Sequence, residues 1–249
     1  MVSEEHPRYA SLMLRNKLVD GYERGIASAH GLIAHGRGEA FDYLLGEQTS
    51  DSARNATKVA CAHLLTANYP VLSVNGNTAT LVPSEIAELH AITGIPVEIN
   101  LFHPSAQRTK RIADHLHACG VANVLTGFDV IKLAHIASDR ANVHKNGIFQ
   151  ADVVFVPLED GDRAQALTKL GKTVLTVDLN PLSRTAIAST VTIVDEVTRA
   201  LKNLVSFAKH FKNENHKDEL DLLKATFDNV ENLKASYALM QERLRSLAR

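Results

Sequence analysis

The sequence carries polar residues suited to nucleotide binding directly after one of its apolar runs. Val177-Asp-Leu-Asn-Pro-Leu-Ser-Arg-Thr185 begins where a β-branched run ends. In that position Asp178 can bind ribose hydroxyls, and Asn180 can hydrogen-bond to the edge of a base. Arg184 and Thr185 can bind phosphate oxygens, because a guanidinium is a permanently charged, forked donor. These residue types in this order predict a phosphate-rich nucleotide, most simply ATP, as the ligand.

A glycine-rich segment near the N-terminus offers a second place for phosphate. Gly36 and Gly38 flank Arg37. Glycine lets the backbone approach an anion closely, and arginine matches the geometry of phosphate oxygens. A structural turn with a solvated arginine is the alternative interpretation. The sequence contains neither GxxxxGK[ST] nor GxGxxG, so the segment is neither a Walker loop nor a dinucleotide fingerprint.

Two further loops carry groups that could bind a second substrate. Asn75 and Asn77 follow an apolar run and supply neutral hydrogen-bonding groups, although Asn75 followed by glycine also predicts a plain turn. Glu159 and Asp160 follow a later apolar run. These two acids could hold a substrate ammonium, or Mg²⁺ through water, or could form a solvated acidic loop.

Histidines and cysteines form no metal or nucleophile pattern in this sequence. There is no HExxH, CxxC or GxSxG. His115 and His117 lie two apart in a segment with helical periodicity, so they point in different directions. Cys61 and Cys119 are isolated among apolar neighbours and are expected to be buried thiols. No metal ligands can be assigned from the sequence.

Short β-branched runs alternate with segments of helical periodicity. Most of the runs are continuously apolar, which is typical of strands buried on both faces of a parallel sheet. The predicted strands are Val71–Val74, Pro96–Asn100, Asn123–Thr126, Asp152–Val156, Thr173–Val177 and Thr190–Val194. The alternation predicts an α/β fold with a Rossmann-like, doubly wound, mostly parallel sheet and helices on both faces. Ligands of such sheets bind at the carboxyl ends of the strands.

Helices are predicted between these strands, over Ser52–Tyr69, Ser84–Thr93 and Ser105–Ala118. A further helix is expected from Asp162 to Leu170, with Asp162 accepting hydrogen bonds from the freed amides of its first turn. Asp195 is expected to cap the next helix in the same way.

The two ends of the chain differ from the middle. Residues 1–50 contain no good strand, and their glycines predict short helices around a glycine and arginine loop. From Lys217 to Arg249 there is no Gly or Pro, and apolar residues recur every three or four positions. We therefore expect a nucleotide-binding domain over 1–212 and one long amphipathic C-terminal helix within 213–249. That helix could pack on its own domain or on a second subunit.

Composition excludes several classes of protein. Lys plus Arg total 27 and Asp plus Glu total 28, so no electrostatic attraction to nucleic acid or to an acidic membrane surface is expected. No run of about 18 apolar residues is present, so no membrane-spanning segment is expected. The first residues lack the pattern of a signal peptide, which predicts a cytoplasmic protein.

Several of these segments together resemble one family, the archaeal-type phosphopantothenate synthetases, also called 4-phosphopantoate–β-alanine ligases. The matching segments are HPRYASL at 6–12, GLIAHGRGEAFDYLLGE at 31–47, PVLSVNGNT at 70–78, VPLEDGDR at 156–163 and DLNPLSRT at 178–185. The resemblance covers about residues 5–205, in order and with similar spacing. The tail beyond about residue 210 lies outside it.

The resemblance implies an ATP-dependent amide ligase of coenzyme A biosynthesis with a Rossmann-like fold, working as a homodimer. Such an enzyme joins 4-phosphopantoate to β-alanine and releases 4'-phosphopantothenate, AMP and pyrophosphate, with Mg²⁺ accompanying the ATP. The ATP contacts it implies fall on Arg15, Arg37, Asp178, Leu179, Asn180, Arg184, Thr185, Glu196 and Val197. Arg8, Asn75, Asn77, Glu159 and Asp160 are then the candidates for substrate binding or catalysis.

One position departs from the family pattern. The segment VDEVTR at 194–199 has Glu196 and Val197 where the family usually has Asn and Ile. A contact to ATP through the backbone would survive that change, whereas a contact through an Asn side chain would not. Neither the base that deprotonates β-alanine nor the phosphate that each arginine contacts is identified.

Two other functions remain open from the residues themselves. A nicotinamide-dependent dehydrogenase could use the same sheet, but the missing GxGxxG argues against it. A regulatory protein that senses ATP would share the nucleotide loops and would need no site for a second substrate. The loops at Asn75–Asn77 and Glu159–Asp160 favour an enzyme.

Overall fold

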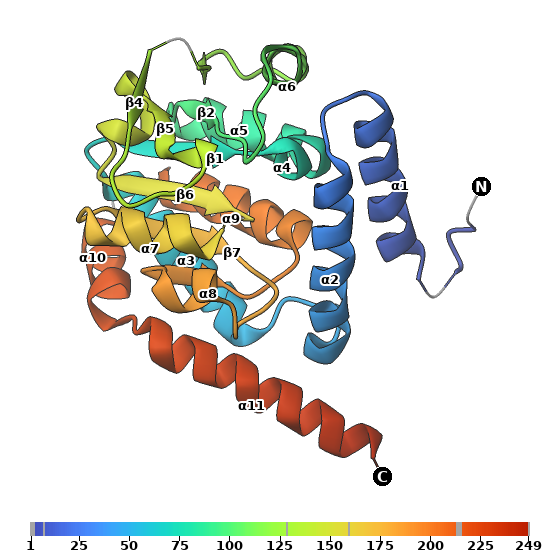
Figure 1. Cartoon of the computed structure of the whole chain (residues 1–249). Helices are drawn as coiled ribbons and strands as arrows, with labels where there is room; N and C mark the ends of the chain where they lie inside the picture. Colours follow the sequence, from blue (N-terminus) through green and yellow to red (C-terminus); the bar gives the residue numbers. More distant parts are fainter. Residues whose placement is uncertain (1–2, 7, 128, 159, 213–215, 249) are drawn as a thin grey trace.

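The protein is built on one six-stranded parallel sheet with the strand order β3-β2-β1-β6-β7-β8 (Figure 1). The computed structural model describes residues 3–6, 8–127, 129–158, 160–212 and 216–248. The strands are β1 (Pro70–Val74), β2 (Val97–Ile99), β3 (Val124–Leu125), β6 (Val153–Pro157), β7 (Thr173–Val177) and β8 (Val191–Ile193). This is the Rossmann strand order, so the predicted doubly wound α/β fold is confirmed.

The register of the strands divides their side chains between two apolar layers. Strand pairing places residues in rows across the sheet: Leu72, Phe155 and Leu175 on one face, and Val71, Val154 and Val174 on the other. All six side chains are fully buried. Burial on both faces explains why the strands read as continuous apolar runs rather than as alternating ones.

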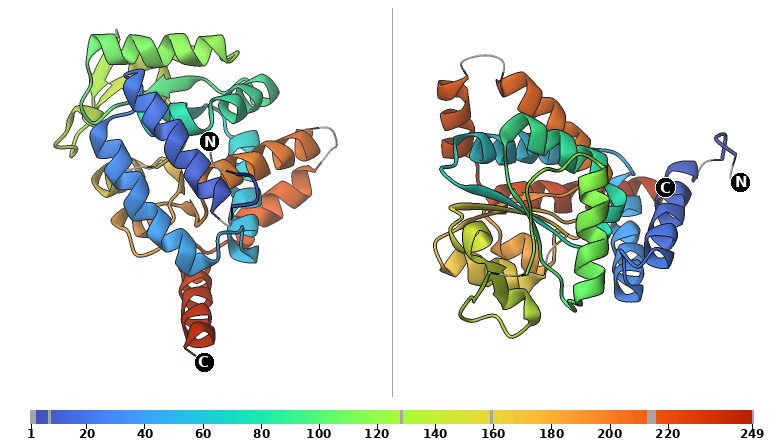
Figure 2. Two further views of the ribbon diagram at one scale, coloured as in Figure 1. Left: turned by 90° about the vertical axis from the view of Figure 1, so that its right-hand side faces the viewer. Right: turned by 90° about the horizontal axis from the view of Figure 1, so that it is seen from above.

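Helices cover both faces of the sheet (Figure 2). One layer contains α3 (Asp51–Thr66), α5 (Pro83–Thr93) and α9 (Val197–Lys212), with the short α4 (Gly76–Leu81) beside them. The other contains α7 (Gly161–Lys169) and α8 (Arg184–Ala188). Helix α6 (Ala106–Ala118) packs on β2 and β3 at the edge of the sheet.

A small antiparallel pair, β4 (Val130–Lys132) with β5 (Asn142–His144), was not predicted. Between and after these strands lie the turns η1 (Asp139–Ala141) and η2 (Lys145–Phe149). Its strands have only three residues each and β4 is largely exposed, so neither carries a clear apolar run. Two carboxylate oxygens of Glu98 on β2 accept hydrogen bonds from the amides of His144 and Ile148, at 3.0 and 2.7 Å, and tie this unit to the sheet.

The prediction of short helices and a glycine loop at the N-terminus is wrong. Residues 9–45 form two long helices that lie side by side at the carboxyl ends of the strands, α1 (Tyr9–Glu23) and α2 (Ala29–Leu45) (Figure 1). The Gly-Arg-Gly segment is inside α2. A Cβ on Gly31 would lie 2.2 Å from Asn77 Oδ1, so this glycine allows a close helix contact rather than a turn.

Two helices are not capped by the residues that were predicted to cap them. Helix α7 begins after Asp160, and Asp162 lies in its first turn without capping it. At the start of α9 the carboxylate of Glu196, not that of Asp195, accepts from the amides of Thr198 and Arg199 at 2.9 and 3.3 Å. In both places several neighbouring acids match the sequence pattern of a cap, and the sequence does not distinguish them. At α7 the N-cap residue, Asp160, makes no capping hydrogen bond through its side chain.

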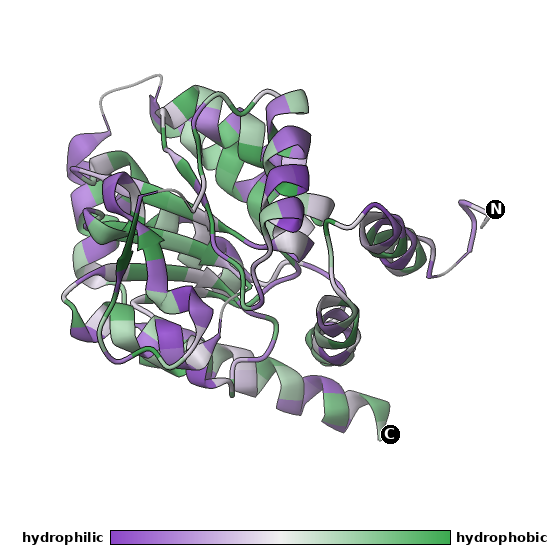
Figure 3. Cartoon of the chain, turned by 45° about the horizontal axis from the view of Figure 1, so that its top comes forward, coloured by the Kyte–Doolittle hydropathy of each residue, from purple (hydrophilic) through white to green (hydrophobic). Residues whose placement is uncertain are grey.

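The C-terminal amphipathic helix is present, but the range predicted for it is broken. It consists of α10 (Lys217–Thr226) and α11 (Asn229–Leu247), because Phe227 is extended and Asp228 caps the second helix. Leu220, Leu233 and Met240 are buried against the same chain, which confirms packing on its own domain. The C-terminal part of α11 extends away from the body (Figure 1), and green and purple residues alternate along the helix (Figure 3).

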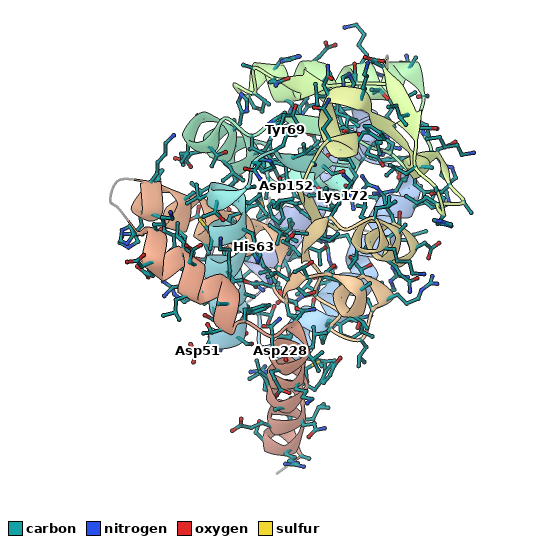
Figure 4. The ribbon with its side chains drawn as sticks, turned by 90° about the vertical axis from the view of Figure 1, so that its left-hand side faces the viewer. Asp51, His63, Tyr69, Asp152, Lys172 and Asp228 are labelled. Carbon is teal, nitrogen blue, oxygen red and sulfur yellow. The ribbon has the colours of Figure 1, made fainter. Side chains whose placement is uncertain are left out.

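Tyr69, Asp152 and Lys172 lie near one another at the amino ends of the strands (Figure 4). Hydrogen bonds from these residues and their neighbours join the loops there. Asp152 accepts from the amides of Asn68 and Tyr69, at 2.7 and 2.9 Å, and Lys172 donates to the carbonyl of Ala151 at 2.6 Å. Because these polar groups form hydrogen bonds that join loops, the amino edge of the sheet has few groups left to bind a ligand. Within the described ranges, no helix is both long and apolar enough to cross a membrane.

Candidate functional site

A cavity of about 650 Å³ opens at the carboxyl ends of the strands, between α2, α6 and the loops after β1, β6 and β7. It spans the point between β1 and β6 where the strand order reverses, which is the usual ligand site of such sheets. Eleven of the predicted site residues line it: Arg37, Asn75, Asn77, Asp160, Asp178, Leu179, Asn180, Arg184, Thr185, Glu196 and Val197. Glu159 lies outside the described residues.

The loop after β7 is held rigid by its own hydrogen bonds. Asp178 Oδ1 accepts from the amide of Asn180 at 2.9 Å, and Oδ2 accepts from the hydroxyl of Ser183. Ser183 in turn caps α8 by accepting from the amide of Ala186 at 2.9 Å. Burial raises the pKa of Asp178 above its ordinary value. The result is a preformed loop that presents one acid and the start of a helix to the cavity.

Arg184 extends from this loop into solvent and into the cavity. Its side chain is 82% exposed and pairs with Asp162 on α7 at 2.9 Å. A Cβ on Gly161 would lie 2.5 Å from the Cβ of Arg184, so only glycine lets the loops after β6 and β7 approach this closely. A largely exposed ion pair is weak, which leaves Arg184 available to an anion.

One face of α2 forms the opposite wall. Read as a helix, positions 31, 34, 35, 38 and 41 fall on one side, and all of them line the cavity. A Cβ on Gly38 would lie 3.8 Å from Leu179 Cδ1, and the absence of that Cβ leaves an apolar slot beside Phe41. His35 was not predicted, because the segment was interpreted as a loop. Burial lowers the pKa of His35, so its imidazole is neutral at neutral pH.

Glu196 places a buried carboxylate on this wall. Only 5% of the residue is exposed. Its Oε2 accepts from the start of α9, whereas no described residue donates a hydrogen bond to its Oε1. A buried carboxylate oxygen without a partner is costly, so this oxygen fits a ligand that brings an N–H or O–H group.

A network around Arg199 fixes α2 and α9 against each other. The guanidinium bonds Asp42 on α2 at 2.5 Å and Asp195 at 2.8 Å. Thr49 donates to the other oxygen of Asp195 at 2.6 Å. These groups do not line the cavity, but they hold the helix that carries Arg37 next to the helix that begins at Glu196.

The loop after β1 uses its predicted amides to join segments. Asn75 caps α4 by accepting from the amide of Thr78 at 3.0 Å, and it donates to the carbonyl of Leu158 at 2.8 Å. Asn77 donates to the carbonyl of Gly31 at 2.8 Å. Both residues line the cavity, yet their side chains are mainly engaged with the protein.

Two arginines that the sequence analysis missed line the far end of the cavity. Arg140, on η1, pairs with Asp160 at 2.8 Å, and Arg108, on α6, donates to the carbonyl of Ile26 at 3.0 Å. Arg108 fell within a predicted helix and Arg140 within a stretch without a predicted element. Neither position follows a predicted strand directly, so the search of post-strand loops could not find them.

A profile of the phosphopantothenate/pantothenate synthetase family matches residues 52–243. The chain belongs to this family. Ligases named 4-phosphopantoate–β-alanine ligase are 48% identical in Methanosarcina mazei, over 99% of this chain and 97% of that protein, and 44% identical in Thermococcus kodakarensis, over 99% and 95%. A third, from Methanospirillum hungatei, is 53% identical over 83% of this chain and 84% of that protein.

As a member of this synthetase family, the chain is a ligase. Its sequence similarity to the relatives covers more of the chain than expected. The profile reaches residue 243, and two relatives align over 99% of the chain. The view that the tail beyond about residue 210 lies outside the resemblance is therefore wrong. The sequences of α10 and of most of α11 are therefore covered by the family profile.

Two arginines expected at the site of this synthetase lie elsewhere in the described chain. Arg15 bonds the carboxylate of Glu39 at 2.6 Å, and Arg8 lies 3.8 Å from the same group. Burial alone would raise the pKa of Glu39, but the hydrogen bonds from Arg15 and Tyr43 outweigh it and lower the pKa. Neither arginine lines the cavity, so their contact with ATP stays a prediction.

The described residues of this synthetase contain no cluster of three His, Cys, Asp or Glu that could hold a metal ion. The acids nearest the phosphate-binding candidates are Asp160 and Asp162, and each is paired with an arginine. This donor set suits Mg²⁺ that arrives already bound to a triphosphate and keeps most of its water, as Mg²⁺ commonly does.

Proposed function

We propose that this synthetase joins 4-phosphopantoate to β-alanine at the expense of ATP, giving 4'-phosphopantothenate, AMP and pyrophosphate for coenzyme A biosynthesis. The relatives named 4-phosphopantoate–β-alanine ligase support it. The observation that carries it is one cavity with nucleotide-type groups at one end and a separate cationic end at the other. A protein that only senses ATP has no use for the second end.

The nucleotide is assigned to the side of the cavity formed by β7, α8, α9 and α2. The slot at Leu179, Phe41 and Val197 would hold the base. Glu196 Oε1 would accept from the exocyclic amine of adenine, and Asp178 would bind the ribose. Asn180 lies beside the base edge.

The phosphates of MgATP would lie against the remaining predicted residues, Arg37, Arg184 and Thr185. Arginine suits this task because its charge is permanent and its donors are forked.

The reaction is proposed to run through an acyl-adenylate. A carboxylate oxygen of 4-phosphopantoate attacks the α-phosphorus, and the bond to the bridging oxygen breaks so that pyrophosphate leaves with the electron pair. The amine of β-alanine then attacks the acyl carbon, AMP leaves, and the nitrogen loses a proton. Such a sequence needs no covalent enzyme nucleophile. It needs charge neutralisation and alignment, which fixed arginines supply.

Labelled substrate tests this route. The enzyme is incubated with MgATP, β-alanine and 4-phosphopantoate carrying ¹⁸O in its carboxylate, and the products are weighed by mass spectrometry. The adenylate route transfers one heavy oxygen to AMP. Heavy oxygen in inorganic phosphate, with ADP as the nucleotide product, would show an acyl-phosphate mechanism instead. Absence of nucleotide turnover would contradict the ligase assignment.

We also propose that the protein works as a cytoplasmic homodimer. Leu244 and Leu247, at the end of α11, are 52% and 78% exposed although they continue the apolar stripe of that helix. Exposed apolar side chains in such a stripe fit a contact with a second subunit.

A further inference from the structure

Helix α11 contacts the loop after β7, although none of the described residues that line the cavity belongs to α11. The hydroxyl of Tyr237 on α11 donates to the carbonyl of Pro181 at 2.9 Å. Pro181 is buried and lies in the middle of the segment 178–185, between the groups assigned to the ribose and those assigned to the phosphates. A hydrogen bond at this carbonyl therefore holds the loop between its two sets of proposed nucleotide contacts.

The ring of the same tyrosine belongs to an apolar cluster that reaches the wall of the cavity. Leu233 and Met240 of α11 are buried in this cluster, and Tyr237, Phe41 and Leu179 pack against it. Phe41 and Leu179 also line the cavity, where they form the slot assigned to the adenine base. The position of this slot therefore depends on the packing of α11 as well as on α2 and the loop.

Side-chain amides fix the first turn of α11 to the sheet and to α8. Asn229 accepts from the amide of Thr192 on β8 at 2.9 Å and donates to the carbonyl of Ala186 at 3.0 Å. Asn232 donates to the carbonyl of Thr192 at 2.8 Å. Tyr237 follows Asn229 by about two helical turns. Because a helix is stiff over that length, the anchored first turn determines where the hydroxyl of Tyr237 lies.

Helix α11 packs on both walls of the side assigned to the nucleotide, passing below α8 and the end of α2 (Figure 1). Hydrogen bonds inside the loop, such as that from the Leu182 amide to Asn180 Oδ1 at 3.0 Å, set the shape of the loop. They cannot set its distance from α2, because α2 takes no part in them. Helix α11 can, because it packs with Leu45 of α2 and bonds the loop through Tyr237.

We propose that Tyr237 is a positioning residue for the nucleotide, which holds the loop after β7 at the distance from α2 that ATP requires. Walls that are already correctly spaced reduce the cost of ordering the site when the ligand binds. The inference rests on the proposed binding of ATP at this side of the cavity, and it extends that proposal to a helix outside the cavity. The competing role is structural, in which the tyrosine stabilises the folded state and has no separate effect on ATP.

Two matched tyrosine variants separate these roles. Tyr237→Phe removes the hydroxyl and keeps the ring. Tyr69→Phe is the control, because Tyr69 also donates to a backbone carbonyl, that of Asn146 at 2.7 Å, but at the amino edge of the sheet (Figure 4). In titration calorimetry with MgATP alone, the Kd of Tyr237→Phe should rise about 3- to 10-fold, as expected for one neutral hydrogen bond. Tyr69→Phe should bind MgATP as wild type does.

Stability and turnover show whether the loss of affinity comes from positioning. Urea unfolding should detect a similar small loss in both variants, because each lacks one hydrogen bond of the same kind. In Tyr237→Phe the KM for ATP should rise while kcat and the KM for 4-phosphopantoate match wild type, as expected when only binding of one substrate is weakened. All three kinetic constants of Tyr69→Phe should match wild type.

Hydrogen exchange observes the loop directly and requires no ligand. The amides of residues 178–185 should exchange faster in Tyr237→Phe than in wild type, and saturating MgATP should restore their protection. Tyr69→Phe should leave the exchange of this segment unchanged. Unchanged exchange of residues 178–185 in Tyr237→Phe would show that local hydrogen bonds hold the loop by themselves, and the inference would then be wrong.

The remaining outcomes distinguish this inference from the proposed function. Equal changes in the Kd for MgATP in the two variants, or no change in either, would make Tyr237 a structural residue and overturn the inference. So would a rise in the KM for 4-phosphopantoate as large as that for ATP, because α11 would then act on the whole cavity. If wild type binds MgATP but releases no AMP, the ligase function fails, and the Kd comparison still decides the role of Tyr237. If wild type does not bind MgATP, both fail.

Discussion

The two ends of the cavity are constructed in different ways. The nucleotide end uses mainly one continuous segment, residues 178–185, whose side chains bond to neighbouring amides and hydroxyls. The other end, which holds Arg108 and Arg140 and is called the arginine end below, is assembled from α6, η1 and the loops after β1 and β2. Hydrogen bonds between distant residues join these elements. Hydrogen bonds between near neighbours fix the geometry of the first end, so that geometry depends on one short segment of sequence. The geometry of the second end depends on how several elements pack at the edge of the sheet.

Removing Arg184 should have the largest effect and should affect the nucleotide end alone. In Arg184→Ala, kcat/KM for ATP should fall about 10- to 100-fold, because one charge-assisted phosphate contact is worth roughly 1.5–3 kcal/mol. The fold should survive, since the side chain is 82% exposed. Steady-state kinetics with both substrates, with circular dichroism as the folding check, measure this. Arg37→Ala should behave similarly, and Arg37→Lys should restore little activity.

The control for Arg184 is its ion-pair partner. Asp162→Asn removes the competing carboxylate and keeps the side-chain volume. If Arg184 acts on phosphate, this variant should keep or improve the KM for ATP. A loss as large as that of Arg184→Ala would mean that the ion pair itself, and not the free guanidinium, supports activity. An unchanged KM for 4-phosphopantoate is expected in both variants.

A substitution at Glu98 should disturb the arginine end, although Glu98 itself does not line the cavity. Its carboxylate holds the amides of His144 and Ile148, next to the segment that carries Arg140. Glu98→Gln keeps one acceptor oxygen and turns an N–H group toward the other amide, whereas the protonated carboxyl of Glu98 still offers two acceptor oxygens. We therefore expect a loss of about 1–3 kcal/mol in unfolding free energy below pH 4.5. The KM for 4-phosphopantoate should rise while the KM for ATP stays constant. Glu88→Gln, at an exposed ion pair, is the control and should cost less than about 1 kcal/mol.

The same residue gives a pH dependence with a defined sign. Burial raises the pKa of Glu98 to about 6 from an ordinary value of 4.5. The folded state therefore holds this proton more tightly, so the stabilising contribution is full below pH 4.5 and is lost as pH rises through 6. Urea unfolding should show the advantage of wild type over Glu98→Gln shrinking by about 2 kcal/mol across this window. A difference that grows with pH would contradict the raised pKa.

A substitution at Glu196 tests whether the adenine base binds at the proposed nucleotide end. Its unpartnered Oε1 should favour ATP, whose adenine donates an amine hydrogen, over GTP, whose guanine presents a carbonyl oxygen there. Glu196→Gln can donate as well as accept, so the preference for ATP over GTP should fall about 10-fold, which corresponds to about 1.4 kcal/mol. Competition kinetics with the two nucleotides measure the ratio. A wild type that uses GTP as well as ATP would place the base elsewhere.

Removing the C-terminal part of α11 should disturb neither the nucleotide end nor the arginine end of the cavity. Removing residues 241–249 leaves the buried Met240 in place, and no residue of α11 lines the cavity. Activity with both substrates should stay within about 2-fold of wild type, because the hydrogen bond from the removed segment to α2, from Arg243 to the carbonyl of Tyr43, is long at 3.5 Å. The mass from light scattering should fall from dimer to monomer, whereas Leu222→Ser, at another exposed leucine, should leave it unchanged. An unchanged mass in the truncated protein would leave dimerisation to the sheet domain.

The sequence by itself determined the sheet and the position of the polar loop after β7. Buried parallel strands are continuous apolar runs, and the polar residues after them must lie at one edge, so Asp178–Thr185 and Asn75–Asn77 could be placed without coordinates. The order of the strands needed the structure. Helix α2 was missed because glycines that serve close packing, as Gly31 does against Asn77, read in sequence as breakers.

Only the tertiary structure decided how distant residues meet. Nothing in the local pattern brings Arg108 and Arg140 to one cavity or turns Arg8 and Arg15 toward Glu39. Periodicity reports which face of an element is buried, but it does not identify the partner that buries it. Contacts across the sheet edge depend on strand order and helix packing, and these are set by the burial of the whole chain rather than by any segment of it.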